Sequence, residues 1–198
     1  MSEGYLQALK LRAERVERLT SWCTEHLASA ESRVLEIGCG HGHFLTAYAT
    51  ANPKQNCVGI DLVTKRIEKA TTKAEKRNLT QLKFLKAELS EFLEALPPEI
   101  QFDRVFMLFP DPWPKKRHHK NRMIQPAFLR RLTEITTPKA DFCFRTDHED
   151  LFAWTVEHLE QSPGWAINAN AEWPLEETSF FQELMDSWRS LVAVKVKR

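Results

Sequence analysis

A glycine-rich motif, Glu36-Ile37-Gly38-Cys39-Gly40-His41-Gly42, directly follows a short apolar run. Glycines let the backbone turn tightly and leave no Cβ between the chain and a ligand, while a following helix presents free N–H groups. A dinucleotide-binding fingerprint reads G-x-G-x-x-G, whereas the third glycine here comes one residue earlier. The carboxylate of Glu36 suits a ligand with a positively charged end, such as S-adenosylmethionine. We therefore expect Glu36, Gly38 and Gly40 to bind this cofactor, and keep a nicotinamide dinucleotide or an unliganded turn as alternatives.

Two further acidic residues, Asp61 and Glu88, each follow a later apolar run. A carboxylate at the end of a buried strand can accept hydrogen bonds from both hydroxyls of a ribose, and this predicts a cofactor-binding role for Asp61. The alternative is that Asp61 only caps the helix that follows. Glu88 is placed to contact the adenine, and its alternative role is a first-turn acid that the helix dipole stabilises.

The most specific segment is Phe109 to Arg122, which reads F-P-D-P-W-P-K-K-R-H-H-K-N-R. Prolines on both sides of Asp111 stiffen the backbone and present this carboxylate rigidly. The basic run that follows can neutralise phosphates, and Trp113 and the histidines can stack on an exposed base. A basic run alone is usually a solvated face. Because this one adjoins a rigid acidic tip next to the predicted cofactor site, we expect it to bind nucleic acid.

Strands and helices alternate along the chain. Hydrophobic periodicity predicts helices over 4–28, 43–50, 63–77, 88–95, 126–136 and 149–160, and strands over 34–37, 57–60, 82–85, 104–108, 142–144 and 190–197. This order predicts an α/β fold with a mostly parallel sheet, helices on both faces and ligands at the carboxyl ends of the strands. We expect the last strand to lie at the edge of the sheet and to run antiparallel to its neighbour.

The composition is that of one globular domain over residues 1–198, with 42% hydrophobic and 28% charged residues. No run of about 18 apolar residues is present, so we expect no membrane span. The first residues are polar where a signal peptide needs an apolar core, and we expect a cytoplasmic protein. The four cysteines form no C-x-x-C pair, so we expect free thiols and no metal site. The net charge is only +1, so attraction to nucleic acid must come from local clusters.

Three segments together resemble the bacterial tRNA (guanine-N7-)-methyltransferases: the glycine motif, Phe109 to Arg122, and Arg145-Thr146-Asp147. The resemblance runs from about Ser32 to the end of the chain. It implies a Rossmann-like class I methyltransferase with a seven-stranded sheet, which uses S-adenosylmethionine to methylate N7 of a guanine in tRNA, at the variable-loop position. The protein would act as a monomer or homodimer.

Residue roles also follow from this resemblance. It implies that Glu36, Asp61, Glu88 and Asp111 line the S-adenosylmethionine site and that Asp111 is also the catalytic residue. It further implies a set of substrate-binding residues, namely Lys115, Arg117, His118, Lys120, Arg122, Asp147 and Thr178.

The chain departs from the family pattern at two places. Glu88 stands where the family usually has aspartate, which keeps the charge on a longer side chain. The family's T-x-F-E reads Thr178-Ser179-Phe180-Phe181 here, so a substrate-binding carboxylate is missing, and Glu177 or Glu183 is the candidate replacement. Either the substrate is held differently here, or the chain is a divergent member of the family whose target has changed. A methyltransferase for a small anionic molecule and a non-catalytic tRNA-binding protein are the alternative functions.

Overall fold

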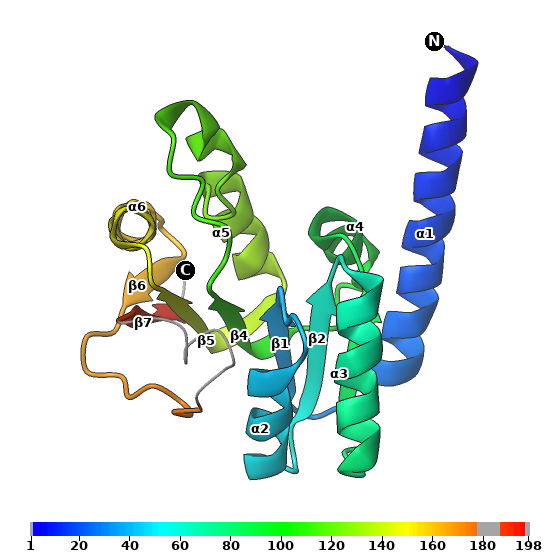
Figure 1. Ribbon diagram of the computed structural model, residues 1–198, viewed down its shortest axis with the longest axis horizontal. Helices are drawn as coiled ribbons and strands as arrows, with labels where there is room; N and C mark the ends of the chain where they lie inside the picture. The colour runs from blue at the N-terminus through cyan, green and yellow to red at the C-terminus, as the bar shows by residue number, and fades with distance from the viewer. Residues whose placement is uncertain (1, 178–186, 197–198) are drawn as a thin grey trace.

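The computed structural model describes residues 2–177 and 187–196, and in these ranges the chain forms one mixed sheet with the strand order β3-β2-β1-β4-β5-β7-β6 (Figure 1). The strands β1 to β5 run parallel to one another, whereas β7 is antiparallel to both of its neighbours, β5 and β6. The strands are β1 (Arg33–Ile37), β2 (Asn56–Asp61), β3 (Leu82–Lys86), β4 (Phe102–Leu108), β5 (Thr136–Thr146), β6 (Trp165–Ile167) and β7 (Arg189–Lys195).

Six α-helices connect or precede these strands in the part of the chain just defined. They are α1 (Glu3–Leu27), α2 (His43–Ala51), α3 (Thr64–Lys76), α4 (Leu89–Ala95), α5 (Pro126–Glu134) and α6 (Glu149–Glu160). A 3-10 helix, η1 (Lys116–Asn121), lies between β4 and α5 in a segment for which the sequence predicts neither a helix nor a strand. The predicted helices are all present, with ends that differ by no more than two residues.

The C-terminal side of the sheet differs from the prediction in two ways. The strand at 189–195 is antiparallel as expected, but it lies between β5 and β6 and so does not form the edge. The edge strand, β6, spans three residues and pairs with β7 from Trp165↔Lys195 to Ile167↔Ala193. Such a short strand carries no readable alternation, which explains why the sequence did not predict it. β5 is also longer than expected and begins at Thr136.

Apolar residues of the central strands alternate between two faces of the sheet, and each face has its own core. Leu35 and Ile37 pack into one core with residues of α1, α4, α5 and α6. Val34 and Phe106 pack into the other core with residues of α2, α3 and the segment 171–175. All four cysteines are free, as predicted, and all four are buried. Within the described ranges, no helix has both the length and the apolar character needed to cross a membrane.

The strand order places one end of β1 at a topological switch point. β1 pairs with β2 on one side and with β4 on the other, so the connections that leave β1 and β4 diverge to opposite faces. In an open α/β sheet this divergence opens a crevice beyond the carboxyl ends of the strands. The glycine motif, Asp61 and the segment that begins at Phe109 all emerge at this end.

Candidate active site

The glycine motif forms an open loop between β1 and α2. Gly38 and Gly40 have left-handed φ values of 75° and 54°, which side chains other than glycine rarely adopt. A Cβ placed on either residue would meet no heavy atom within 4 Å, so this face of the loop is free to contact a ligand. Gly42 is different, because a Cβ there would lie 2.5 Å from the ring of Phe84. Position 42 therefore requires glycine because Phe84 packs against it, whereas Gly38 and Gly40 leave room for a ligand.

Glu36 is the most isolated carboxylate of the site. Its side chain is only 3% exposed, and its Oε2 atom has no hydrogen-bond partner in the described residues. Burial raises the pKa of Glu36 to about 8; a hydrogen bond from the backbone of Leu45 opposes the shift, and the negative charge of Asp61 adds to it. A buried acceptor without a partner is costly. A bound ligand could therefore supply the hydrogen-bond donor or cation that Oε2 of Glu36 lacks.

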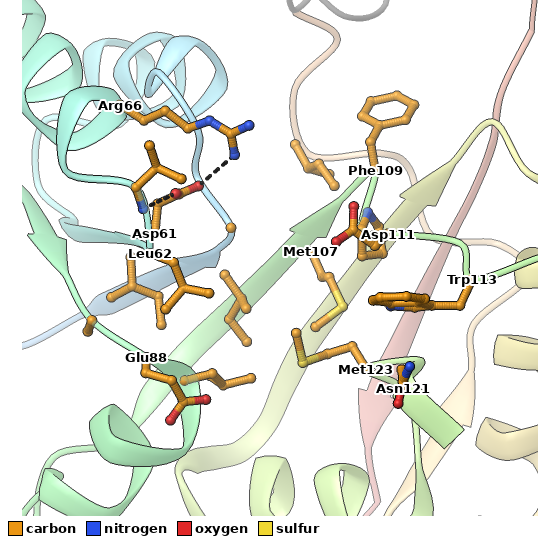
Figure 2. Close-up of a pocket in the computed structure, with 18 residues that line it drawn as sticks. Asp61, Leu62, Arg66, Glu88, Met107, Phe109, Asp111, Trp113, Asn121 and Met123 are labelled. Atoms are coloured by element: carbon orange, nitrogen blue, oxygen red, sulfur yellow. Dashed lines mark hydrogen bonds and ion pairs between the residues drawn. The ribbon is translucent and has the colours of Figure 1, made fainter. Parts of the chain in front are cut away.

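Asp61 connects the glycine loop to the start of α3. Its Oδ1 accepts a hydrogen bond from the backbone N–H of Val63 at 2.8 Å, and its Oδ2 accepts one from Gly40 at 3.1 Å. Arg66 approaches the same carboxylate at 3.5 Å (Figure 2). The hydrogen bond from Val63, the N-cap residue of α3, corresponds to the alternative role predicted for Asp61 at the start of this helix. A carboxylate has about four acceptor positions, so capacity remains for ribose hydroxyls.

Glu88 is the N-cap residue of α4. Its carboxylate accepts hydrogen bonds from the backbone N–H of Glu91 at 3.0 Å and from the hydroxyl of Ser90. Partial burial raises the pKa of Glu88, but these hydrogen bonds outweigh it and the pKa is lowered. Glu88 also borders the cavity that Asp61 borders. Glu88 therefore caps α4 and does not lie in its first turn as the alternative prediction had it, and this capping role does not remove Glu88 from the cavity.

Two cavities meet at the strand ends and form one cleft. The first has a volume of about 380 Å³ and the second about 350 Å³, which is within the range of small-ligand sites. Asp61 and Glu88 line one side of the first cavity, opposite Asp111 and Trp113 (Figure 2). Glu36 and Asp147 line the second cavity. The residues common to both are Gly38, Arg66, Leu108, Phe109, Pro110 and Asp111. Asp111 therefore lies where the two cavities join.

The segment that carries Asp111 has a strained and anchored backbone. Phe109 and Trp113 adopt left-handed φ values of 50° and 44°, an unfavourable conformation that persists only where the surroundings enforce it. Phe109 donates a backbone hydrogen bond to the carbonyl of Arg145 at 2.8 Å. The carbonyl of Pro112 accepts one from Nε of Arg122 at 3.0 Å. These two anchors fix the backbone on either side of Asp111, whose side chain is exposed to the cleft.

Arg122 differs from its predicted role as a substrate-binding residue. Its side chain is only 3% exposed, and its guanidinium lies 5.1 Å from the ring centre of Trp154. A second bond, 3.4 Å long, joins it to the carbonyl of Asp150. A guanidinium that is packed inside the protein is not available to a phosphate. The prediction for Arg122 is therefore corrected, because this side chain holds the Pro112 backbone in place.

The other predicted substrate-binding residues divide into three groups. Lys115, Arg117 and Lys120 are exposed on and beside η1, and the half-buried ring of His118 lies edge-on to Trp113 at 5.8 Å. Asp147 is exposed and borders the second cavity. The segment 178–181, which includes Thr178, lies outside the described residues, as does Glu183.

The structure also identifies site residues that the sequence did not suggest. Arg66 borders both cavities, and its place in the first turn of the helix after Asp61 was the available signal. His41 and His43 border the second cavity from the glycine loop and the start of α2. Arg145 is buried, pairs with Glu176 at 2.9 Å and thereby tethers the segment that leads to residue 178.

Comparisons with known proteins agree with this geometry. A family profile described as "Putative methyltransferase" matches residues 30–186. A protein of Chromohalobacter salexigens is 36% identical over 139 residues, which cover 70% of this chain and 56% of that protein. A protein of Nitrobacter winogradskyi is 33% identical over 145 residues, covering 72% of this chain and 56% of that protein. Both are named tRNA (guanine-N(7)-)-methyltransferase, and this chain spans little more than half of their length.

Solved structures share the fold at low sequence identity. A SAM dependent methyltransferase from Aquifex aeolicus superimposes with a TM-score of 0.59 at 19% identity and covers 92% of each chain. The aminoglycoside resistance methyltransferase NpmB1 gives a TM-score of 0.61 at 18% identity, covering 89% of this chain and 93% of that one. The α/β class I methyltransferase fold expected from the sequence is confirmed.

Proposed function

This chain belongs to the methyltransferase family whose profile it matches, and from that premise we propose that it transfers the methyl group of S-adenosylmethionine to N7 of a guanine in tRNA. The names of the curated relatives support the substrate. One observation of the site carries the proposal: Oε2 of the buried Glu36, which has no partner among the described residues, shares a cleft with the exposed carboxylates of Asp111 and Asp147. We also propose that the protein acts in the cytoplasm, as a monomer or homodimer.

The residues of the cleft fit S-adenosylmethionine. The unpartnered Oε2 of Glu36 would accept a hydrogen bond from the amino group of the methionine end, and Asp61 would accept hydrogen bonds from the ribose hydroxyls. Gly38 and Gly40 leave open space along the loop between these two carboxylates. Glu88 would lie near the adenine in the first cavity. When bound, the cofactor supplies a methyl group that is activated by the adjacent sulfonium.

Guanine N7 carries a lone pair and no hydrogen, so the protein needs no general base to create the nucleophile. Catalysis then depends on holding the guanine in line with the methyl group. The carboxylates of Asp111 and Asp147 can accept hydrogen bonds from N1–H and N2–H₂ of the guanine. They also stabilise the positive charge that develops on the base as the methyl group arrives. Trp113 borders the same cavity and can stack on the base.

Exposed cations next to the cleft complete the proposed substrate site. Lys115, Arg117 and Lys120 project from and beside η1, close to Trp113 through its contact with His118. They would neutralise phosphates of the RNA backbone around the target guanine. Replacing Lys115 and Arg117 with glutamine should weaken tRNA binding and flatten its salt dependence, which a binding series at increasing salt measures. Unchanged binding across that series would reject this assignment.

The decisive experiment replaces Asp111 with asparagine. We expect Asp111→Asn to lower methyl transfer to bulk tRNA on the order of a hundredfold or more, because a transition-state contact is lost. Cofactor affinity, measured by isothermal titration, should change little, since the neighbouring Asp61 and Glu36 remain. Asp150→Asn, at an exposed position in the first turn of α6, is the matched control. Full activity of Asp111→Asn would rule out the catalytic role, and wild-type protein that leaves tRNA free of 7-methylguanosine by nucleoside mass spectrometry would refute the function.

A further inference from the structure

A row of basic side chains follows α3 away from the cleft. Arg66, Lys69, Lys73, Lys76 and Arg77 are spaced by three, four, three and one residues, which places them on one side of the helix. Arg66 borders both cavities of the cleft. The other four border a separate shallow groove along the helix. We call this row the α3 basic stripe.

The positive charge of the α3 basic stripe is largely uncompensated. Among the ion pairs of the described residues, the stripe takes part in one, between Arg66 and Asp61. Glu68 is the one acidic residue that borders the groove. On α1, by contrast, Arg12 and Arg15 are paired with glutamates of α4. A row of like charges repels itself, and a bound anion would relieve that repulsion.

The α3 basic stripe is continuous with the mouth of the cleft. Lys73 donates a hydrogen bond from Nζ to the carbonyl of His41 at 2.8 Å, and His41 borders the second cavity. Partial burial and the nearby cations Lys69, Arg66 and Lys73 lower the pKa of His41. The cations therefore act electrostatically on the same cavity that holds the carboxylates of the proposed site.

The dimensions of the stripe suit a polymer better than a small molecule. Lys69 and Arg77 are eight residues apart, which is about 12 Å along a helix. In Figure 1, α3 descends in front of the sheet from the carboxyl end of β2, whereas the segment between β4 and α5 rises beyond that end. The two basic regions thus extend in different directions from the cleft. A small anion could not contact both, while an RNA chain that crosses the cleft could.

We propose that the α3 basic stripe is a second contact surface for the phosphate backbone of the RNA substrate, distinct from the cations of η1. This inference rests on the proposed function. It predicts that bound tRNA extends across the cleft from η1 to the side of the molecule covered by α3. Lys69, Lys76 and Arg77 are the residues to test, because Arg66 contacts Asp61 and Lys73 contacts the glycine loop.

The test combines K69Q, K76Q and R77Q in one protein. Glutamine is a good helix former, so the fold of α3 should be retained. The control combines K10Q, K54Q and R130Q, which removes the same charge from exposed positions elsewhere. We expect the slope of log affinity for tRNA against log salt to become shallower by about 2 to 3 in the α3 variant, at roughly 0.7 to 0.9 for each of three lost phosphate contacts. Cofactor affinity should be unchanged in both variants.

The possible results separate this inference from the proposed function. If the wild type binds and methylates tRNA but the α3 variant and the control have equal salt slopes, the α3 basic stripe is not an RNA contact and the proposed function stands. If the wild type neither binds nor methylates tRNA, the proposed function fails and the inference fails with it. A shallower slope in the α3 variant alone supports both.

Discussion

Glu36 offers a direct test of the proposed cofactor site, because its isolation in the free protein should be measurable as an effect of pH on stability. Replacing Glu36 with glutamine keeps the size and shape of the side chain and removes its charge. The amide oxygen can still accept the hydrogen bond from the backbone of Leu45. The variant therefore resembles the wild-type protein with a permanently protonated Glu36.

The size of the effect follows from the pKa of Glu36, which burial raises from 4.5 to about 8. The folded protein holds the proton more tightly than the unfolded chain, so stability is lost as the pH rises between these two values. Each unit of pKa shift corresponds to about 1.4 kcal/mol. From about pH 5 to pH 8, the free energy of unfolding of the wild type should fall by about 3 kcal/mol relative to Glu36→Gln.

The assay is denaturant unfolding of both proteins at several pH values, with the exposed Glu31→Gln as the matched control. The wild type and Glu36→Gln share all other titrating groups, so the difference between their curves isolates position 36, and Glu31→Gln gives the effect of removing an exposed glutamate. Glu36→Gln should also bind S-adenosylmethionine more weakly, because a neutral amide can accept a hydrogen bond from the protonated amino group of the cofactor but cannot form an ion pair with it. Wild-type and Glu36→Gln stabilities that change in parallel with pH would refute the description of Glu36 as a buried acid with a raised pKa.

Further predictions concern the glycine loop and the Arg122 anchor. Gly40→Ala should cost on the order of 1 to 2 kcal/mol of stability from backbone strain alone. Gly42→Ala should cost more, because its Cβ would also overlap Phe84. Thermal unfolding ranks the two variants, and the reverse order would contradict the packing role of Gly42. Arg122→Leu should lower the free energy of unfolding by about 1 to 3 kcal/mol, since the Pro112 carbonyl loses its donor, yet leave the salt slope of tRNA binding unchanged. The comparison protein is Lys120→Gln, which removes an exposed cation of η1. If Arg122→Leu also gave a shallower salt slope, Arg122 would contact RNA after all.

The elements of the fold could be predicted because their signals are local. Helical periodicity and short apolar runs give the order of helices and strands, and that order gives a mostly parallel sheet. The three-residue strand β6 could not be predicted, because it forms only where β7 provides a partner. The position of β7 inside the sheet depends on that same pairing, so it could not be predicted from the sequence either.

The sequence by itself determined which residues follow the strand ends, and therefore which could reach the cleft: the glycine motif, Asp61 and Asp111. Only the tertiary structure decided how each is used, because burial depends on segments that are distant in the chain. Arg122 reads as one more cation of a basic run, yet packing against Trp154 of α6 makes it an internal anchor. Glu36 reads as an acid before a turn, yet the surrounding core buries it and leaves its Oε2 without a hydrogen-bond partner among the described residues. The α3 basic stripe has a helical spacing in the sequence, and the fold alone places its first residue in the cleft.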